Sequence, residues 1–307
     1  MNRVRVELGA DVAHAMGCYG KGIGIAVLDS GILPHPDFVR KGNRILQFVD
    51  FISMNGKYGE KKSHEIPYCD PAGHGTHVAG IIAGDGSLSS GKYCGMAPES
   101  HLVCCRVLDE KGEGSASAVT EAIRWVIRHK GEYGIRILNL SFGSTEHGEA
   151  ADELNALAEE AWDCGLIVVA SSGNSGPMPG SVTAPGSSKK VITVGGDALE
   201  LKPGRGPTAE CVMKPELIAP SSRIMSTAVV GAGTHNLHYT YIRRSGTSMA
   251  TPMASGAIAV LLGCEPSLSN KEVKQILRDS AVSSGLAKEI QGWGRLNLRN
   301  MLRVAGF

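Results

Sequence analysis

The stretch that most constrains the fold lies near the C-terminal end of the chain, at 246–263. It reads GTSMATP and continues as MASGAIAVLLG, in which Ser255 is the only hydroxyl. A helix that is apolar on every side has to be buried, and small side chains let neighbouring elements approach it closely. The sequence therefore predicts a central buried helix that begins near Ser248, with Pro252 in or near its first turn.

Ser248 has two interpretations at the start of this helix. Serine is a common N-cap, because its hydroxyl accepts a hydrogen bond from an unpaired backbone N–H of the first turn. The position also suits a reactive serine, since the free N–H groups and the positive end of the helix dipole stabilise a developing negative charge. The stretch by itself favours the N-cap.

Composition and charge narrow the class of protein. The chain has 307 residues, of which 42% are hydrophobic and 20% are charged, and its net charge is +1. This charge gives no electrostatic reason to expect nucleic acid or an anionic membrane as a partner, and no apolar run of about 18 residues predicts a membrane span. With no linker or repeat to divide it, we expect residues 1–307 to form a single domain.

The eight cysteines are spread along the chain, several of them inside apolar runs. They show neither C-x-x-C pairs nor metal-finger spacing, and the N-terminal segment MNRVRVELGADVAHAMG has no apolar signal core. We therefore expect reduced thiols in a cytoplasmic protein.

Continuous apolar runs alternate with helical patterns along the chain. Such runs are typical of parallel strands buried on both faces, and they predict strands at 23–28, 45–51, 101–109, 135–140, 166–170 and 191–196. Helical spacing predicts helices at 11–16, 74–82, 118–127 and 150–162, and a capping box at Ser269 and Glu272 predicts another. The alternation indicates a three-layer αβα fold with a mostly parallel central sheet. The polar segment 55–69 reads as a surface loop.

Four polar residues are expected at strand ends and helix starts, where proteins with parallel sheets have their active sites. Asp29 ends a strand, His74 and Ser248 each open a helix, and Asn174 lies in a turn after a strand. Asp29 alone reads equally well as a structural acceptor for loop N–H groups. Together, the four are the parts of acyl transfer. His74 would take the proton of Ser248, Asp29 would fix the imidazole tautomer, and Asn174 Nδ2 with the Ser248 N–H would bind the oxyanion.

Four blocks of sequence resemble the signature blocks of the subtilisin-like serine proteases, the subtilases. The resemblance extends from about Lys21 to Leu302, and the segments GKYCGMAPES and RGPTAECVMKPELIAP are closest to the bacterial intracellular type. The blocks occur in the family's order of Asp, His and Ser. They are DSG at 29–31, HGTHVAG at 74–80, SSGNSG at 171–176 and GTSMATP at 246–252.

The resemblance implies a serine endopeptidase with Asp29, His74 and Ser248 as its triad and Asn174 in its oxyanion hole. Proteins or peptides would bind as an extended strand in a groove. None of the residues expected to contact the substrate is acidic, so we expect an apolar or medium-sized residue before the scissile bond, rather than Lys or Arg. These residues are Leu140, Ser141, Phe142, Gly143, Ser171, Ser172, Gly173 and Thr183.

The chemistry requires no cofactor, but the resemblance raises the question of a structural calcium ion. Asp37 corresponds to an acidic residue that often binds calcium in the family, together with the loop after the histidine helix, where this chain has Asp85. Calcium takes roughly six to eight oxygen ligands, and the sequence indicates these two carboxylates. Only 28 residues precede Asp29, so either the enzyme folds without a prodomain or a leader has been removed.

Two other functions stay open at this point. A peptide-binding pseudoprotease would be expected to lack a triad residue, and the sequence contains all three. An esterase would carry a G-x-S-x-G elbow, where this chain has G-T-S-M-A. The sequence indicates neither the physiological substrate nor the oligomeric state.

Some residues outside these blocks carry weaker expectations. Cys69, five residues before His74, is either a surface-loop thiol without a role or a thiol close enough to the histidine for thiol reagents to inhibit the enzyme. Five histidines have no evident partner and are expected at the surface: His14, His35, His64, His101 and His147.

Overall fold

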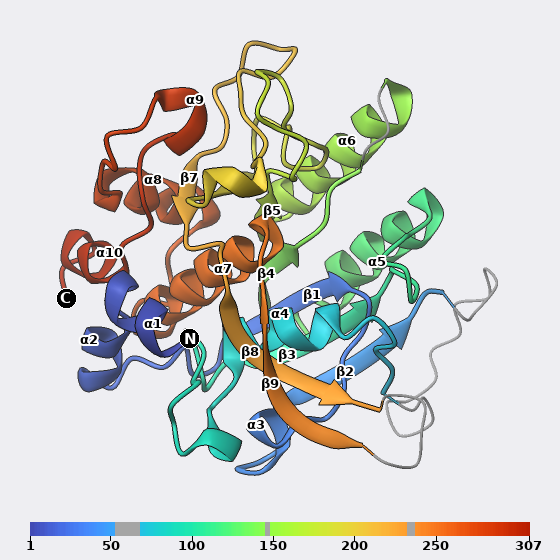
Figure 1. Ribbon diagram of the computed structural model, residues 1–307, viewed down its shortest axis with the longest axis vertical. Coiled ribbons are helices and arrows are strands. Elements are labelled where there is room, and N and C mark those ends of the chain that lie inside the picture. Colours follow the sequence, from blue (N-terminus) through green and yellow to red (C-terminus); the bar gives the residue numbers. More distant parts are fainter. Residues whose placement is uncertain (53–67, 145–147, 232–236) are drawn as a thin grey trace.

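The computed structural model of the chain describes residues 1–52, 68–144, 148–231 and 237–307 (Figure 1). The loop predicted at 55–69 lies almost wholly outside these residues. The elements follow in the order α1 (Asn2–Leu8), α2 (Ala10–Ala15), β1 (Gly24–Asp29), α3 (Pro36–Val39), β2 (Ile45–Asp50), α4 (His74–Ala83), η1 (Ser87–Ser89), β3 (His101–Arg106), α5 (Ala116–His129), β4 (Ile135–Leu140), α6 (Glu149–Asp163), β5 (Ile167–Ser171), β6 (Ile192–Gly196), η2 (Leu199–Leu201), β7 (Leu217–Ala219), β8 (Ile224–Val230), β9 (His238–Arg244), α7 (Thr247–Cys264), α8 (Asn270–Ser280), α9 (Lys288–Gln291) and α10 (Leu298–Val304).

A seven-stranded sheet forms the middle layer, with the strand order β2-β3-β1-β4-β5-β6-β7. All of its neighbouring strands pair in parallel. Strand β1 lies between β3 and β4 and is buried at every position, which agrees with its continuous apolar run. The predicted three-layer fold with a mostly parallel sheet is confirmed.

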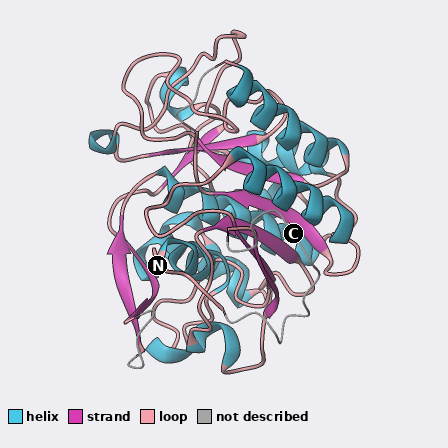
Figure 2. Cartoon of the chain, turned by 90° about the vertical axis from the view of Figure 1, so that its right-hand side faces the viewer, coloured by secondary structure: helices cyan, strands magenta, loops and turns pink. Residues whose placement is uncertain are grey.

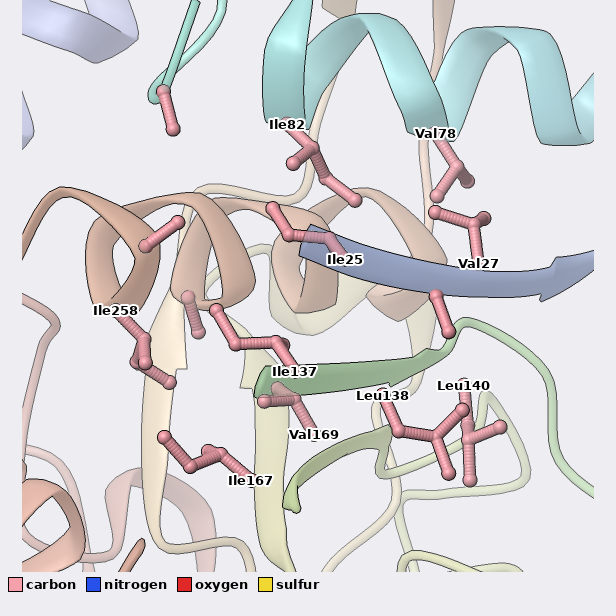
Figure 3. Close-up of a cluster of buried hydrophobic side chains, with 14 of the residues drawn as sticks. Ile25, Val27, Val78, Ile82, Ile137, Leu138, Leu140, Ile167, Val169 and Ile258 are labelled. Carbon is pink, nitrogen blue, oxygen red and sulfur yellow. The ribbon is translucent and has the colours of Figure 1, made fainter. Parts of the chain in front are cut away.

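Helices cover both faces of this sheet (Figure 2). Helices α4 and α7 pack against each other on one face, and α5 and α6 pack together on the other. In Figure 3, Val78 and Ile82 of α4 point toward Val27 and Ile25 of β1, while Ile258 of α7 lies over the strands that follow. This packing fixes the start of α4 close to the carboxyl end of β1.

Helix α7 is the buried central helix that the sequence predicts. By length and composition alone, this 18-residue helix could cross a membrane, although the sequence analysis found no apolar run of that length. In the structure, 83% of the helix is buried inside the protein, as expected for a core helix. The helix begins at Thr247, so Pro252 lies in the second turn rather than the first. Because proline lacks an N–H, the helical hydrogen bond to the carbonyl oxygen of Ser248 cannot form.

An antiparallel hairpin of β8 and β9, which the sequence analysis did not predict, packs over α4. The hydroxyl of Ser226 donates a hydrogen bond to the carbonyl oxygen of His77, and that of Thr227 donates to the carbonyl oxygen of Thr76, both at 2.8 Å. Strand β9 is half-buried or exposed along its length and therefore shows no apolar run. Helix α1 and strand β7 were also not predicted.

His35 is fully buried, so the expectation of a surface position was wrong for this residue. Its Nδ1 accepts a hydrogen bond from the backbone N–H of Asp37 at 3.2 Å and so caps α3. Its ring packs edge-on against Tyr239 and Tyr241 of β9. Packing of the hairpin, which is distant in sequence, thus buries a histidine for which the sequence alone offered no partner. His14 and His101 are half-buried, and His64 and His147 lie outside the described residues.

Candidate active site

The carboxylate of Asp29 and the imidazole of His74 meet at the carboxyl end of β1. His74 Nδ1 lies 2.7 Å from Asp29 Oδ1, and the backbone N–H of Ser30 donates to the same oxygen, also at 2.7 Å. The Asp29 residue is 1% exposed, whereas the His74 side chain is 22% exposed. Because Nδ1 is engaged by the carboxylate, Nε2 is the ring nitrogen available to exchange protons with another group.

Opposing influences set the pKa of His74. Burial lowers it, but the negative charge of Asp29 and the hydrogen bond to that carboxylate outweigh burial, so the pKa lies above the ordinary imidazole value. The positive charge of Arg244 works in the other direction and lowers it. The imidazolium that forms when His74 accepts a proton is therefore stabilised by Asp29.

A buried carboxylate that the sequence analysis missed, Asp70, holds the turn before α4. It accepts hydrogen bonds from the Thr76 N–H at 2.7 Å, from the Thr76 hydroxyl at 2.6 Å and from the Ser30 hydroxyl at 2.7 Å. The Ser30 hydroxyl in turn accepts the N–H of Gly75 at 3.0 Å. This network connects the residue after Asp29 to the first turn of α4. The sequence signal that could have identified Asp70 is an acidic residue a few positions before a predicted helix start.

Ser248 lies in the first turn of α7, and Asn174 lies beside the start of that helix, in the loop after β5. Asn174 Oδ1 accepts the backbone N–H of Thr247 at 3.2 Å and its hydroxyl at 3.3 Å, which leaves Asn174 Nδ2 as a donor. Gly246, at φ +139°, is the N-cap residue of α7, and a methyl group there would lie 3.7 Å from Asn174 Nδ2 and 3.9 Å from Ser248 N. Two N–H donors are thus grouped at one helix N-terminus, as binding of an oxyanion requires.

Arg244 links the two halves of this site. It is the last residue of β9, four positions before Ser248. Its Nη2 donates a hydrogen bond to the carbonyl oxygen of Ala72 at 2.8 Å, two positions before His74. The sequence analysis did not single out Arg244, because its contact spans 172 residues of sequence.

Thr183 lies between two of the segments expected to bind the substrate. A methyl group on Gly143 would lie 2.0 Å from Thr183 Oγ1, and one on Gly173 would lie 2.4 Å from the same atom. The two segments are also joined directly, since the Ser171 hydroxyl donates to the carbonyl oxygen of Phe142 at 2.9 Å. The side chain of Thr183 therefore narrows the space between them, and its Oγ1 is buried without a hydrogen-bond partner among the described residues.

The other expected contact residues differ in exposure. Phe142 and Gly143 are accessible at the surface and Thr183 is half-buried, whereas the other five residues are buried. These five are Leu140, Ser141, Ser171, Ser172 and Gly173.

Two cavities adjoin these segments. One, of about 660 Å³, is lined by Thr183 and Ala184 and also by three acidic residues, Asp152, Glu159 and Glu210. The other, of about 590 Å³, lies between 112–116 and Phe142, and Leu154 and Leu157 of α6 contribute apolar surface to it. Phe142 thus borders the space across from residues 112–116, whose sequence is GEGSA.

Asp37 and Asp85, the two carboxylates considered for a calcium site, already have protein partners. The phenol of Tyr241 donates to Asp37 at 2.9 Å, and the backbone N–H of Leu88 donates to Asp37 Oδ1 at 3.0 Å. Asp85 Oδ1 accepts the N–H of Ser87 at 2.7 Å. Across the described ranges, no three His, Cys, Asp or Glu side chains gather as a metal site would require. These residues fit a calcium ion poorly.

Cys69 is half-buried and packs against the hydrophobic core beside the turn that follows Asp29. Its carbonyl oxygen accepts the N–H of Ile32 at 3.0 Å. Burial raises the pKa of its thiol, with Arg106 working against this, so the thiolate that reacts with reagents is disfavoured. Inhibition through Cys69 stays a prediction.

Comparison with known proteins adds independent information. The profile described as "Subtilase family" matches residues 20–294. The chain is 35% identical to serine protease AprX of Bacillus subtilis, over 92% of this chain and 66% of that protein, or just under two thirds of its length. It is 33% identical to Subtilisin Savinase of Lederbergia lenta, over 94% of this chain and 93% of that protein. The solved structure of Sphericase superimposes with a TM-score of 0.72 at 29% identity, covering 91% of this chain and 92% of that chain.

Proposed function

The chain belongs to the subtilase family of serine proteases, and we propose that it is an endopeptidase that uses Asp29, His74 and Ser248 as its catalytic triad. The observation that carries the proposal is the 2.7 Å contact between His74 Nδ1 and Asp29 Oδ1 in an otherwise buried corner of the sheet. It supplies a base whose tautomer and orientation are fixed before the substrate arrives.

The reaction proceeds by two acyl-transfer steps. Ser248 Oγ attacks the scissile carbonyl carbon while His74 Nε2 takes the hydroxyl proton, and Asp29 stabilises the resulting imidazolium. His74 then gives the proton to the departing amine, which leaves an acyl-enzyme on Ser248. A water molecule, deprotonated by His74, releases the acid and restores the hydroxyl.

The tetrahedral intermediate of each step carries a negative charge on the former carbonyl oxygen. Asn174 Nδ2 and the backbone N–H of Ser248 donate hydrogen bonds to it, and the dipole of α7 adds a favourable field. The two hydrogen bonds from Thr247 to Asn174 Oδ1 support this role, because they fix the amide with its donor end free.

Labelling and turnover together test the assignment. We expect a fluorophosphonate probe to label the wild type and Asn155→Ala, a control on α6, but not Ser248→Ala. His74→Ala and Asp29→Asn should lose peptide turnover by at least about 10⁴-fold with their fold unchanged. Labelling without peptide turnover would favour an esterase, and absence of both in the folded wild type would favour a pseudoprotease.

The preferred residue before the scissile bond is apolar or medium-sized. Thr183 supports this, because its side chain stands between Gly143 and Gly173 and limits the depth of the pocket. Acidic residues line both adjoining cavities, but none lies at 140–143, at 171–173 or at Thr183. A peptide panel in which Lys or Arg is cut fastest would contradict the preference and implicate Asp152 or Glu210.

We place the enzyme in the cytoplasm, acting on proteins or peptides without a required cofactor, nucleic acid or membrane. All eight cysteines are free thiols, which suits a reducing compartment. Fractionation of the native host with antibody detection tests this placement, and recovery of the enzyme in the external medium would contradict it.

A further inference from the structure

The thiols of Cys18 and Cys264 lie in contact although 246 positions separate them in sequence. The Cys264 thiol donates to Cys18 Sγ, and the two Sγ atoms are 2.6 Å apart. Cys18 follows α2, and Cys264 is the last residue of α7, the helix whose first turn carries Ser248. Figure 1 shows α1 and α2 beside this end of α7.

Contacts other than the sulfur pair hold the two backbones in place. A methyl group on Gly263 would lie 3.0 Å from the Cα of Gly20, so these main chains touch directly. The carbonyl oxygen of Gly20 accepts the Ser100 hydroxyl at 2.9 Å, and the N–H of Cys18 donates to the carbonyl oxygen of Ala13 at 2.9 Å. The main chains that carry the two sulfur atoms are therefore held close together by contacts other than the sulfur pair, as a disulfide between them requires.

We propose that Cys18 and Cys264 form an intramolecular disulfide when a low-molecular-weight disulfide, such as oxidised glutathione, is present. Both residues are half-buried, so a small oxidant has access, whereas Cys94, Cys104 and Cys105 are buried. The bond joins the N-terminal helical segment to the end of α7. Formation of this disulfide needs no proteolytic activity, so the proposal is independent of the function proposed above.

The exchange balances in two steps. Burial, together with the contact to Cys18, raises the pKa of Cys264 to about 12, which disfavours Cys264 as the first nucleophile. The Cys18 thiolate displaces one small thiolate and becomes a mixed disulfide. The thiol of Cys264 loses its proton, attacks Cys18 Sγ and expels the second small thiolate. The protein loses two electrons and two protons, which leave as two molecules of the small thiol.

Mass spectrometry of the Ser248→Ala protein, which avoids self-digestion, tests the pairing. After treatment with oxidised glutathione and alkylation, we expect a cross-linked peptide containing both residues. The thiol count should fall by two beyond any glutathione adducts. Cys211→Ser, a control at an exposed cysteine, should retain the cross-link, and Cys18→Ser should lose it. A stable glutathione adduct on Cys18 with Cys264 still alkylated would overturn the proposal.

Thermal unfolding gives a second measurement. Because the cross-link closes most of the chain into a loop, the oxidised protein should melt about 5–10 °C higher than the reduced protein, and dithiothreitol should reverse the gain. The Cys18→Ser variant should show no such response to the oxidant. Equal melting temperatures for oxidised and reduced protein, with the cross-link present, would show that it is not a native pairing.

Discussion

Arg244 Nη2 donates a hydrogen bond to the carbonyl oxygen of Ala72 across 2.8 Å. Arg244 ends β9 just before the loop that begins α7, and Ala72 lies in the turn that leads into α4. The contact therefore couples the segment that carries Ser248 to the segment that carries His74. It also places a positive charge close enough to lower the pKa of His74.

Arg244→Met should move the acid limb of the pH profile of kcat/KM to higher pH. His74 acts as a base when it is neutral, so activity falls as the pH drops through its pKa. Removing the positive charge removes an influence that lowers this pKa, and the pKa rises. Arg243→Met, at the exposed neighbouring position, is the control and should leave the limb in place. A shift of the limb to lower pH in Arg244→Met would contradict the electrostatic argument.

Asn174→Ala should lower kcat by about 10²–10³-fold with little change in KM, the effect known for the corresponding donor in subtilisin. The physical reason is that Nδ2 binds the oxyanion more strongly than the ground-state carbonyl. Steady-state kinetics on one chromogenic peptide suffices as the measurement. A rise in KM at unchanged kcat would instead place Asn174 in substrate binding.

Thr183→Gly should broaden the preference before the scissile bond toward large apolar residues. Opening the space between Gly143 and Gly173 should raise kcat/KM for Phe relative to Ala at this position by about tenfold or more. Thr183→Val keeps the volume and should keep the wild-type preference. Cleavage profiles that match between wild type and Thr183→Gly would show that another residue limits the pocket.

Chelation should leave the thermal stability of the Ser248→Ala protein unchanged. A calcium ion present at about 100 times its dissociation constant would contribute roughly 2.7 kcal/mol, which is readily detected as a shift in melting temperature. Asp37 is instead satisfied by the Tyr241 phenol and the Leu88 N–H. Melting curves with EDTA and with added calcium provide the measurement. A large difference in melting temperature between them would show that the protein binds calcium.

Tyr241→Phe tests the hydrogen bond that the Tyr241 phenol donates to Asp37. It removes a hydrogen bond to the fully buried Asp37, which should cost about 1–3 kcal/mol in the free energy of unfolding. Tyr239→Phe, on the same strand, serves as the control. Denaturant unfolding measures both variants, and equal stability of Tyr241→Phe and wild type would show that the phenol does not anchor Asp37.

The sequence by itself determined the features that depend on neighbouring residues. The apolar run ending at Asp29 predicted β1, the small apolar residues after Pro252 predicted the buried α7, and Ser269 with Glu272 predicted a helix start that the structure shows as a capping box. These succeed because burial on all sides and helix capping leave local patterns of residue type. The strand alternation likewise placed Asp29 and Asn174 at the same edge of the sheet.

Only the tertiary structure decided the contacts between distant segments. It buried His35 under the β8–β9 hairpin, placed Arg244 on the turn before His74, set Thr183 between Gly143 and Gly173, and brought Cys18 against Cys264. None of these leaves a local signature, because each partner would be equally acceptable on a solvated surface. Their energies come from packing between elements far apart in sequence, which periodicity and spacing along one segment cannot encode.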